Sequence, residues 1–533
     1  MLWPPNVATI AWLGGTVAAM SAPDPPSTGR RGARRSTRTP RPRRSTQHHR
    51  HLESPFEPLR ILTDDHVAHL HHSATRFLQE HGVRVLLPEA RSILGAAGAS
   101  VDDDMMVRIP VELVERSLES APSGCRIAGR NPERDMVVGG RSMSFLPAGG
   151  PPYVSDLHDG RRTGTLHDFE QFVRLAQSFD VVHGLAPSVE AQDVPIDIRH
   201  LVTTRSMIEL SDKPVFVYAR GRRIVDDTFE LIRIGHGVSR DDFESRPHCW
   251  TNINTNSPRQ LDVPMSLGII DFARAGQMCI MTPFTLAGAM APVSLAGALL
   301  LQHLEALAAV TLAQATRAGA PVVYGAFTSN VDMRSGSPAF GTPEAMKAAL
   351  ASGQLARHVG LPWRSSGSSS SNVEDAQAGY ETMMNMSGAV LGGANVIMHA
   401  AGWMEGGLCS SYEKFVLDVE MLQMLAETFQ PIDMASDELA YDVIADVNPG
   451  GHFFGTQHTL ERYEHAFRDP LVFTRANFGQ WTDEGSTTAS QRAHRVWQET
   501  LRSFEAPPID DAVAAELGDF VTRRIAAGGA APD

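Results

Sequence analysis

The stretch HCWTNINTNSPRQLDVPMSLGIIDFARAGQMCIMTPFT, residues 248–285, decides the fold. A β-rich apolar segment at 248–256 is followed by a helical pattern at 261–276 and by a second β-rich segment at 278–285. A helix between two apolar strands is typical of a parallel βαβ unit, because parallel strands need a crossover connection. The chain is therefore predicted to be an α/β protein.

The same alternation runs through the chain after residue 141. Eight strands are predicted, at 142–149, 181–188, 214–220, 248–256, 278–285, 321–329, 362–369 and 394–402. Helices are predicted between them, and an eighth helix follows the last strand at 412–429. Eight such pairs predict a (β/α)8 TIM barrel. An open doubly wound sheet is the alternative, but the first strand lacks the G-x-G-x-x-G turn of a dinucleotide site.

Composition divides the rest of the chain. Residues 1–52 are predicted to be a disordered basic tail, 53–140 an N-terminal helical segment, 141–430 the barrel and 431–533 a C-terminal extension that packs on it. The apolar start at 1–22 does not read as a signal peptide, because the basic residues follow it. No later apolar run reaches the ~20 residues that a membrane span requires.

Charge and cysteine spacing exclude several classes of function. The net charge is −14, and the first fifty residues hold nine Arg and one acid, so the remaining chain is more acidic still. Such a body repels nucleic acid. The four cysteines are far apart in sequence and predict neither a disulfide framework nor a zinc site. We expect a cytoplasmic protein with no metal or cofactor bound in the chain itself, which forms a homo-oligomer.

In a barrel the active site forms where the strands end. The polar and aromatic residues at the predicted strand ends, or in the loops after them, are Tyr218, Arg220, Asn254, Tyr324, Asp332, His399, Trp403 and Glu405. Asn252, Asn254 and Asn256 recur at a period of two, so they share one face of a strand. They form either an amide ladder toward the barrel mouth or an ordinary turn before Pro258.

The serine-rich run SSGSSSSNVED resembles a flexible linker by composition. Ser371 and Glu374, however, have the spacing of a capping box, which favours a small-residue loop before a helix. Tyr380 and Glu381 would then lie near the mouth. In the segment GGHFFGTQHT, His452 is expected to be either a buried structural histidine or part of a C-terminal lid over the barrel mouth.

These segments together resemble the corrinoid-dependent trimethylamine methyltransferase family from about Leu62 to the C-terminal region. The resemblance is distributed over EHGVRV, AAGASVDDDMMVRIP, SDKPVFVYARG, PVVYGAFTSNVDMRSGSPAFGTPE, SSNVEDAQAGYET and GGHFFGTQHTLERYEHAFRDPLVFTR. It implies a TIM barrel that passes a methyl group from a methylated amine to Co(I) held by a partner corrinoid protein. Archaeal members carry pyrrolysine, whereas this sequence holds only standard residues.

Because this sequence lacks pyrrolysine, a quaternary amine such as glycine betaine is favoured over trimethylamine as the substrate. A quaternary ammonium leaves as a neutral amine and needs no proton, so positioning and desolvation can supply much of the catalysis. Aromatic faces at Tyr218, Tyr324, Tyr380 and Trp403 are expected to hold the cation, together with acids at Asp332, Glu381 or Glu405. Arg220, His399, His452 or the Asn cluster would hold a carboxylate. The competing hypotheses are trimethylamine as substrate, a zinc-dependent barrel enzyme, and a methylated-amine-binding protein without catalysis.

Overall fold

The computed structural model describes residues 49–532, so the predicted tail lies almost wholly outside the described part. A curled sheet of eight strands forms its centre, in the order β1-β7-β19-β18-β15-β13-β11-β10. Seven of these strands run parallel, and β1 pairs antiparallel with the start of β7. The strands are β1 (Leu52–Glu53), β7 (Ser142–Phe145), β10 (Val215–Phe216), β11 (Cys249–Thr255), β13 (Met278–Pro283), β15 (Val322–Gly325), β18 (Trp363–Ser366) and β19 (Val396–Met398).

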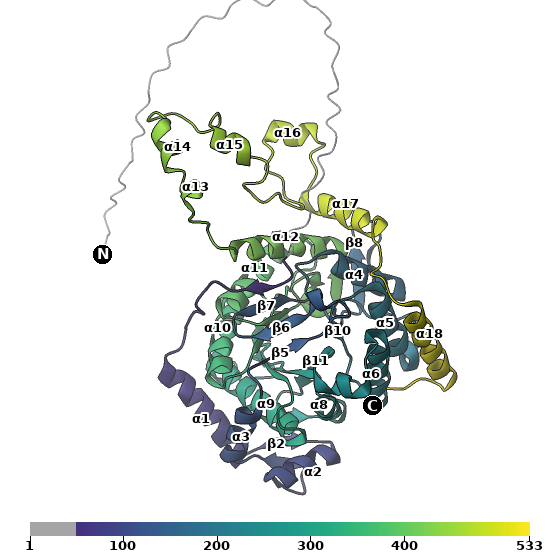
Figure 1. Ribbon diagram of the computed structural model, residues 1–533. Coiled ribbons are helices and arrows are strands. Elements are labelled where there is room, and N and C mark those ends of the chain that lie inside the picture. The colour runs from purple at the N-terminus through teal and green to yellow at the C-terminus, as the bar shows by residue number, and fades with distance from the viewer. Residues whose placement is uncertain (1–48, 533) are drawn as a thin grey trace, which may run out of the picture. The chain divides into compact units, whose positions relative to one another are not determined.

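Helices follow the strands along the chain and surround the sheet (Figure 1). Each predicted helix between residues 166 and 429 is present within a few residues of its expected bounds. They are α4 (Leu166–Ser178), α5 (Ile196–Leu210), α6 (Arg222–His236), α8 (Val263–Ala275), α9 (Leu295–Thr316), α10 (Pro343–His358), α11 (Ala376–Leu391) and α12 (Tyr412–Thr428). The short helix α7 (Arg240–Ser245) was not predicted. The mixed α/β fold and seven of the eight predicted strands are confirmed.

The predicted strand at 181–188 is not a regular strand, which corrects the sequence interpretation. The His183 N–H donates to the Phe145 carbonyl over 2.9 Å, and the Leu185 N–H donates to the Pro214 carbonyl over 3.0 Å. The Phe145 N–H, however, donates to the His183 ring nitrogen Nδ1 over 3.0 Å, so a side chain takes the place of a backbone acceptor. Pro187 has no N–H to offer. The segment is extended between β7 and β10 without a complete ladder.

Three N-terminal helices lie against α9. They are α1 (Asp64–Glu80), α2 (Pro88–Ala97) and α3 (Val111–Ser120). Among the described helices, α9 is long and apolar enough to cross a membrane, but 78% of its most apolar window is buried inside the protein. A helix that is apolar on all sides needs cover on all sides. The N-terminal segment supplies that cover on the side away from the sheet.

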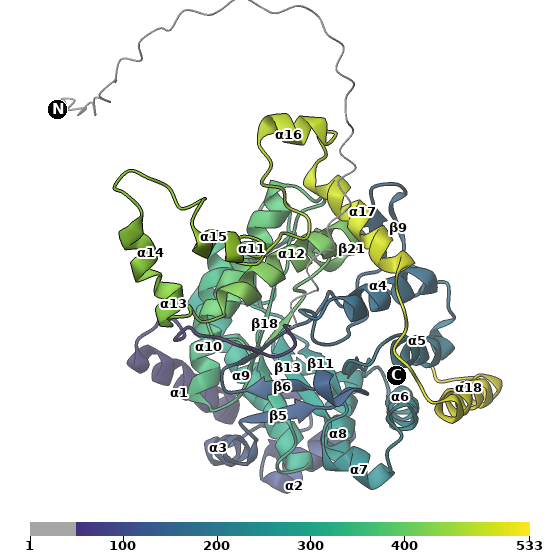
Figure 2. The same cartoon turned by 45° about the horizontal axis from the view of Figure 1, so that its top comes forward.

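A hairpin fills the amino-terminal end of the curled sheet. Strands β5 (Gly124–Ile127) and β6 (Met136–Gly139) pair antiparallel and are labelled near β11 and β13 in Figure 2. Their apolar side chains join a cluster with Trp250, Ile280 and Val396 from the sheet. The Ala128 N–H donates to the carbonyl of Pro247, just before β11. The hairpin therefore leaves the opposite, carboxyl-terminal end of the strands for a ligand.

Short strands form the remaining sheets. One contains β12 (Gln260–Leu261), β2 (Val83–Val85), β4 (Met106–Arg108) and β3 (Ser100–Val101). A second contains β14 (Leu286–Ala287), β16 (Ser329–Val331) and β17 (Pro338–Ala339). A third contains β20 (Trp403–Met404), β21 (Cys409–Ser411), β8 (Tyr153–Asp156) and β9 (Gly160–Thr163).

The C-terminal extension has two parts with different packing. Helices α17 (Ala489–Arg502) and α18 (Asp511–Ala526) pack on α12 and on α5 and α6, respectively. Buried Glu413 of α12 accepts hydrogen bonds from His494 and Trp497 of α17, at 2.7 and 2.9 Å. The intervening helices α13 (Ser436–Leu439), α14 (Tyr441–Asp446), α15 (Gln457–Arg462) and α16 (Phe478–Asp483) contain no buried residue.

Candidate functional site

A cavity of about 250 Å³ lies at the carboxyl-terminal ends of the central strands. Its walls come from residues in or after β7, β10, β11, β15, β18, β19 and β20. Of the predicted site residues, it gathers Tyr218, Arg220, Asn254, His399 and Trp403. Side chains distant in sequence meet here because parallel strands all end at the same edge.

Aromatic rings form much of the wall. The Trp403 ring lies 3.8 Å from the His399 ring between centroids, and the Phe327 ring lies 5.4 Å from His399. On the β10 side, the rings of Phe216 and Tyr218 are perpendicular, with centroids 5.1 Å apart. The indole N–H of Trp403 is buried without a hydrogen-bond partner among the described residues. It remains available to a ligand or to water.

Arg364 places a buried positive charge in this cavity. Its side chain is 1% exposed on β18, and the guanidinium lies 5.2 Å from the Phe327 ring centroid. One nitrogen donates to the Ala326 carbonyl over 3.2 Å, whereas Nε has no hydrogen-bond partner among the described residues. Burial lowers the pKa of Arg364 to about 9. A buried cation without a carboxylate partner is costly, so the site favours an anionic group from a ligand.

His399 is held in one orientation beside Arg364. Its Nδ1 lies 2.8 Å from the Ser366 hydroxyl, which lies 2.6 Å from the Ser368 hydroxyl. The backbone of His399 has φ of 56°, a left-handed conformation that costs a non-glycine residue energy and that clusters at functional sites. Burial, and then the charge of Arg364, lower the pKa of His399 well below its ordinary value. His399 is therefore neutral at physiological pH.

The asparagines of β11 share one face, as their spacing predicts. The Asn252 amide donates to Asn254 Oδ1 over 3.1 Å, and the Thr282 hydroxyl donates to Asn252 Oδ1 over 2.7 Å. The Asn254 amide donates to the Thr282 carbonyl over 3.1 Å. Both asparagines line the cavity, and Asn256 instead bonds to Asp262 outside it.

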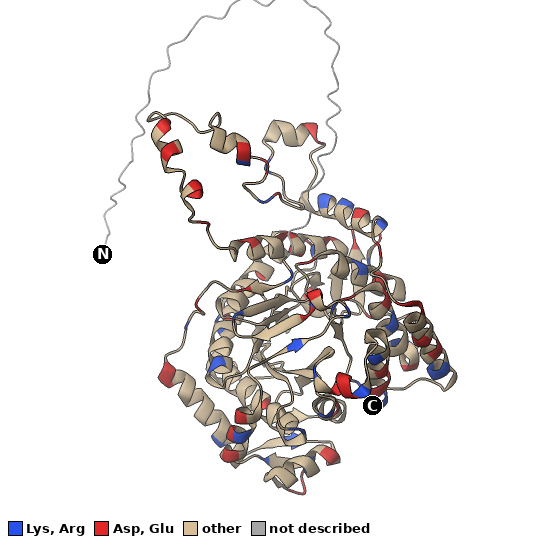
Figure 3. Cartoon of the chain, viewed as in Figure 1, with Lys and Arg blue, Asp and Glu red and all other residues tan. Residues whose placement is uncertain are grey.

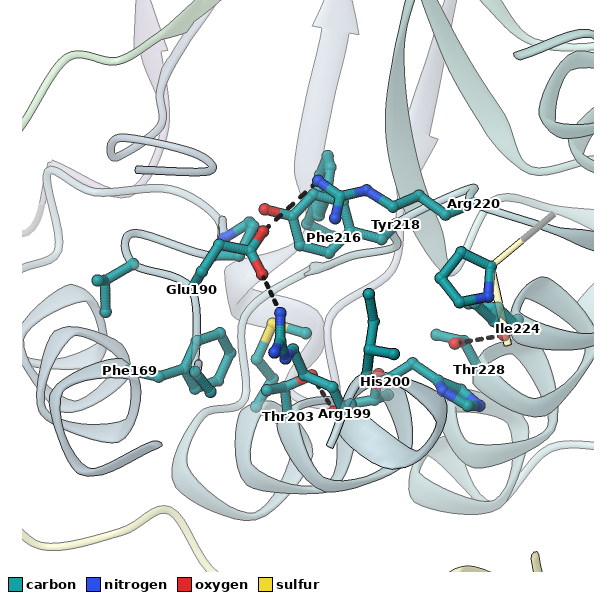
Figure 4. Close-up of a pocket in the computed structure, with 17 residues that line it drawn as sticks. Phe169, Glu190, Arg199, His200, Thr203, Phe216, Tyr218, Arg220, Ile224 and Thr228 are labelled. Carbon is teal, nitrogen blue, oxygen red and sulfur yellow. Dashed lines mark hydrogen bonds and ion pairs between the residues drawn. The ribbon is translucent and has the colours of Figure 1, made fainter. Parts of the chain in front are cut away.

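A second cavity shares the wall formed by Phe216, Tyr218 and Arg220 (Figure 4). In this second cavity Glu190 forms ion pairs with Arg199 at 3.3 Å and with Arg220 at 3.5 Å. The Arg220 guanidinium also lies 4.2 Å from the centroid of the Tyr218 ring. Glu190 therefore orients Arg220 from behind the wall, and does not itself line the cavity at the strand ends.

The other predicted site residues lie elsewhere. Tyr324 points away from the sheet interior toward α9, where its hydroxyl bonds to Gln302 and to His303 at 3.1 and 2.9 Å. Tyr380 is 78% exposed on α11, and Asp332 lies in an exposed turn. Glu405 pairs with Arg161, at 2.9 Å. His452 is exposed beside Phe454, so the buried structural interpretation of this histidine is wrong.

Glu381 organises the serine-rich loop. Its Oε2 accepts hydrogen bonds from the Ser369 hydroxyl and from the backbone N–H groups of Ser370 and Ser371, at 2.8, 2.7 and 3.1 Å. The loop is therefore not a flexible linker. The predicted capping box is also wrong, because Asp375 is the N-cap of α11 and accepts from the N–H groups of Gln377 and Ala378. Asp375 is the N-cap because its side chain satisfies two backbone N–H groups of the first turn.

Arg364 and Phe327 were missed from the sequence. The available signal for Arg364 was an arginine inside the predicted strand at 362–369, where a charged residue has to face either solvent or a functional cavity. Between residues 49 and 532, no three His, Cys, Asp or Glu side chains gather closely enough to hold a metal ion. The donor set for the zinc hypothesis is thus missing from the described chain.

Comparison with known proteins places the chain in a family. A family model described as trimethylamine methyltransferase matches residues 28–529. The chain belongs to the trimethylamine methyltransferase family. The chain is therefore a methyltransferase.

Curated relatives in this family cover most of the chain. A glycine betaine methyltransferase of Desulfitobacterium hafniense strain Y51 is 37% identical over 87% of this chain and 97% of its own length. A trimethylamine methyltransferase of Desulfitobacterium hafniense strain DSM 10664 / DCB-2 is 30% identical over 86% of this chain and 93% of its own. The crystal structure of the hydroxylamine MtmB complex shares the fold, with a TM-score of 0.50 and 11% identity over 86% of this chain and 88% of that one.

Proposed function

We propose that this enzyme transfers a methyl group from a betaine, a quaternary ammonium that carries a carboxylate, to Co(I) of a partner corrinoid protein. Glycine betaine is the smallest such substrate, and the 37%-identical relative is named for it. The relatives named for trimethylamine are less similar, at 30% identity and below. The cavity itself supplies an independent reason to prefer the betaine.

The charge of the cavity lining carries this proposal. Arg220 and Arg364 line it, and no Asp or Glu is among its lining residues in the described chain. Arg220 is paired with Glu190 behind the wall, whereas Arg364 has no carboxylate partner in the described chain. A protonated methylamine without a carboxylate would therefore meet the charge of Arg364 with no lining acid to offset its own charge. A betaine brings a carboxylate for Arg364 and a trimethylammonium group for the aromatic rings, so both ends are satisfied.

The residues around the cavity suggest the role of each group. Trp403, Tyr218 and Phe327 offer ring faces to the trimethylammonium group, and Arg364 with the asparagines of β11 holds the carboxylate. Co(I) attacks one methyl carbon, the carbon–nitrogen bond breaks, and its electron pair stays on nitrogen as a neutral tertiary amine. No proton moves in this step, so neutral His399 is a positioning group and not an acid.

A closed ring of strands is part of the proposal. Segment 181–188 would occupy the eighth position between β7 and β10, as its two backbone hydrogen bonds to Phe145 and Pro214 suggest. The catalytic domain would then span 141–430, with the helical segment 53–140 and the extension 431–533 as appendages.

Free Cys249, Cys279 and Cys409 suit a reducing, cytoplasmic setting.

A methyl-transfer panel tests the function. The purified protein is incubated with Co(I) cobalamin, or with its corrinoid protein, and with glycine betaine, trimethylamine or choline, and methylcobalamin is followed by its absorbance. We expect methyl transfer from glycine betaine and little from the other two. If trimethylamine is the only compound that gives methylcobalamin, glycine betaine is not the substrate. If glycine betaine binds but no methylcobalamin forms, the chain is a binding protein.

A further inference from the structure

The second cavity, behind the wall of Phe216, Tyr218 and Arg220, has charged groups of its own. Figure 4 shows Glu190 between the guanidinium groups of Arg199 and Arg220, with which it forms ion pairs at 3.3 and 3.5 Å. The volume of this cavity is about 50 Å³, which is room for roughly three to five waters at ~10–15 Å³ each. A ligand that fills the second cavity is therefore small, and it meets charges of both signs.

An unsatisfied histidine nitrogen faces the same space. His200 of α5 lines the second cavity and is 8% exposed. Its Nε2 lies 3.1 Å from Asp227 Oδ2, and Arg524 of α18 donates to that carboxylate at 2.6 and 3.0 Å. Because a carboxylate only accepts, Nε2 carries the proton, and Nδ1 is an acceptor without a hydrogen-bond partner in the described chain. A buried acceptor of this kind indicates that the cavity holds a ligand or water.

The helices around the second cavity carry both signs of charge. Helix α18 packs on α5 and α6, and Figure 3 shows red and blue segments on all three. A ligand with a single charge would be attracted by one set of these groups and repelled by the other. A small zwitterion suits the surroundings better.

Loss of a methyl group changes which hydrogen bonds an amine makes. Under the proposed function, the substrate is a quaternary ammonium and has no N–H, and its demethylated product forms as a neutral tertiary amine. That amine then takes up a proton from water at neutral pH, as the amine of lysine does with an ordinary pKa of about 10. The protonated product is a zwitterion with one N–H donor, so it needs an acceptor that the substrate does not need.

The two cavities differ in whether they supply that acceptor from an acid. The strand-end cavity is lined by Arg364 and by no Asp or Glu in the described chain. The second cavity is lined by Glu190. Arg220 lines both cavities, so its guanidinium is within reach of a carboxylate on either side of the wall. The wall thus separates a site suited to the substrate from one suited to the product.

We propose that the second cavity binds the demethylated product, a protonated tertiary amine that carries a carboxylate, and that Glu190 distinguishes it from the quaternary substrate. This inference rests on the proposed function. The product N–H donates to the Glu190 carboxylate, and Arg199 and Arg220 hold the product carboxylate. Its methyl groups lie among apolar side chains such as Phe169 and Met207. A quaternary ammonium leaves the Glu190 acceptor without a donor, so it binds there more weakly.

Calorimetric titration of the native protein without any corrinoid tests this proposal. Dimethylglycine, the product of glycine betaine, is titrated alone and again with saturating glycine betaine. We expect the dissociation constant of dimethylglycine to stay within about twofold, because the two ligands occupy different cavities. Displacement of dimethylglycine by glycine betaine would place both in the strand-end cavity and overturn the proposal. The absence of dimethylglycine binding at millimolar concentration would overturn it as well.

The variant Glu190→Gln keeps the size of the side chain and removes its charge. We expect the affinity for dimethylglycine to fall roughly tenfold or more relative to that for glycine betaine, because a charge-assisted hydrogen bond is lost. Glu209→Gln, which breaks an ion pair with Arg205 on α5, is the matched control. An affinity ratio that is the same in Glu190→Gln and in the native protein would contradict the proposal.

Two further measurements separate the possible failures. Circular dichroism checks that each variant is folded, and if Glu190→Gln does not fold, the competition titration of the native protein decides. Methyl transfer from glycine betaine is assayed on the same preparation. If transfer occurs and dimethylglycine has no separate site, this inference fails while the proposed function stands.

Discussion

Two buried polar regions lie on opposite sides of the central sheet and differ in how well their polar groups are satisfied. Behind β15, the Tyr324 hydroxyl bonds to His303 and Gln302, and the Thr328 hydroxyl donates to Gln302 over 2.6 Å. At the strand ends, Arg364 Nε and Trp403 Nε1 have no hydrogen-bond partner in the described chain. Buried polar groups are normally satisfied, so the first region fits a structural role, and the second is the region that we propose binds the substrate.

The largest change in kcat/KM is expected from Arg364→Met, which tests whether the strand-end region binds the substrate. Without its guanidinium the carboxylate of the substrate is buried unpaired, which costs roughly 2–5 kcal/mol, so kcat/KM for glycine betaine falls by about 30-fold or more. The free energy of unfolding stays level or rises, because an unpaired buried charge is removed. Arg161→Met, which removes an arginine outside the cavity, is the matched control. Unchanged kinetics in Arg364→Met would place the carboxylate elsewhere.

The structural region should respond to pH through His303. Burial, and then the charges of His71 and His358, hold the pKa of His303 well below its ordinary value. The unfolded chain therefore takes up this proton first, and stability is lost as pH falls below the ordinary histidine value. Below that pH, His303 lowers the free energy of unfolding by about 1.4 kcal/mol per pH unit. Chemical denaturation between pH 7.5 and 5 measures the slope, and His303→Gln should flatten it; an equal slope in that variant would contradict this assignment.

A smaller effect is expected from Trp403→Leu. Loss of one ring face costs the trimethylammonium group about 0.5–2 kcal/mol, so KM for glycine betaine rises roughly 2- to 30-fold. Tyr380→Leu is the control, because that ring is 78% exposed on α11. Steady-state kinetics of both variants decide the point. A larger effect at Tyr380 than at Trp403 would reverse the assignment of the cation site.

The smallest effect is expected from Tyr324→Phe. Its hydroxyl bonds only within the structural region, so its loss costs about 1 kcal/mol of stability and leaves kcat/KM unchanged. Thermal denaturation and kinetics on the same preparation test both parts. A tenfold fall in kcat/KM would show that the two regions are coupled.

The sequence predicts the strands better than the direction of their side chains. Apolar runs separated by helical patterns located seven strands and their helices, because that alternation follows from burial on both faces of a parallel sheet. Tyr324 and Val323 are neighbours on β15, and only the pleat determines that Val323 faces the interior. Tyr218, Asn254, His399 and Trp403 were found because they lie at or just after strand ends.

Segment 181–188 and Arg364 show two other limits. Composition could not reveal that the His183 ring would replace a backbone acceptor, because that contact depends on where Phe145 lies. Arg364 was visible as an arginine inside a predicted strand. The fold was needed to show that it faces a cavity whose lining holds no acid among the described residues.

The central claim is that Arg364 recognises the carboxylate of the substrate. It is tested most directly by the affinity of the native protein for two quaternary methylammonium ligands, one with a carboxylate and one without. Glycine betaine and tetramethylammonium are titrated by calorimetry without any corrinoid. Because Arg364 recognises the carboxylate, we predict that glycine betaine binds at least roughly 30-fold more tightly, a difference of about 2 kcal/mol. Equal affinities, or tighter binding of tetramethylammonium, would contradict the assignment.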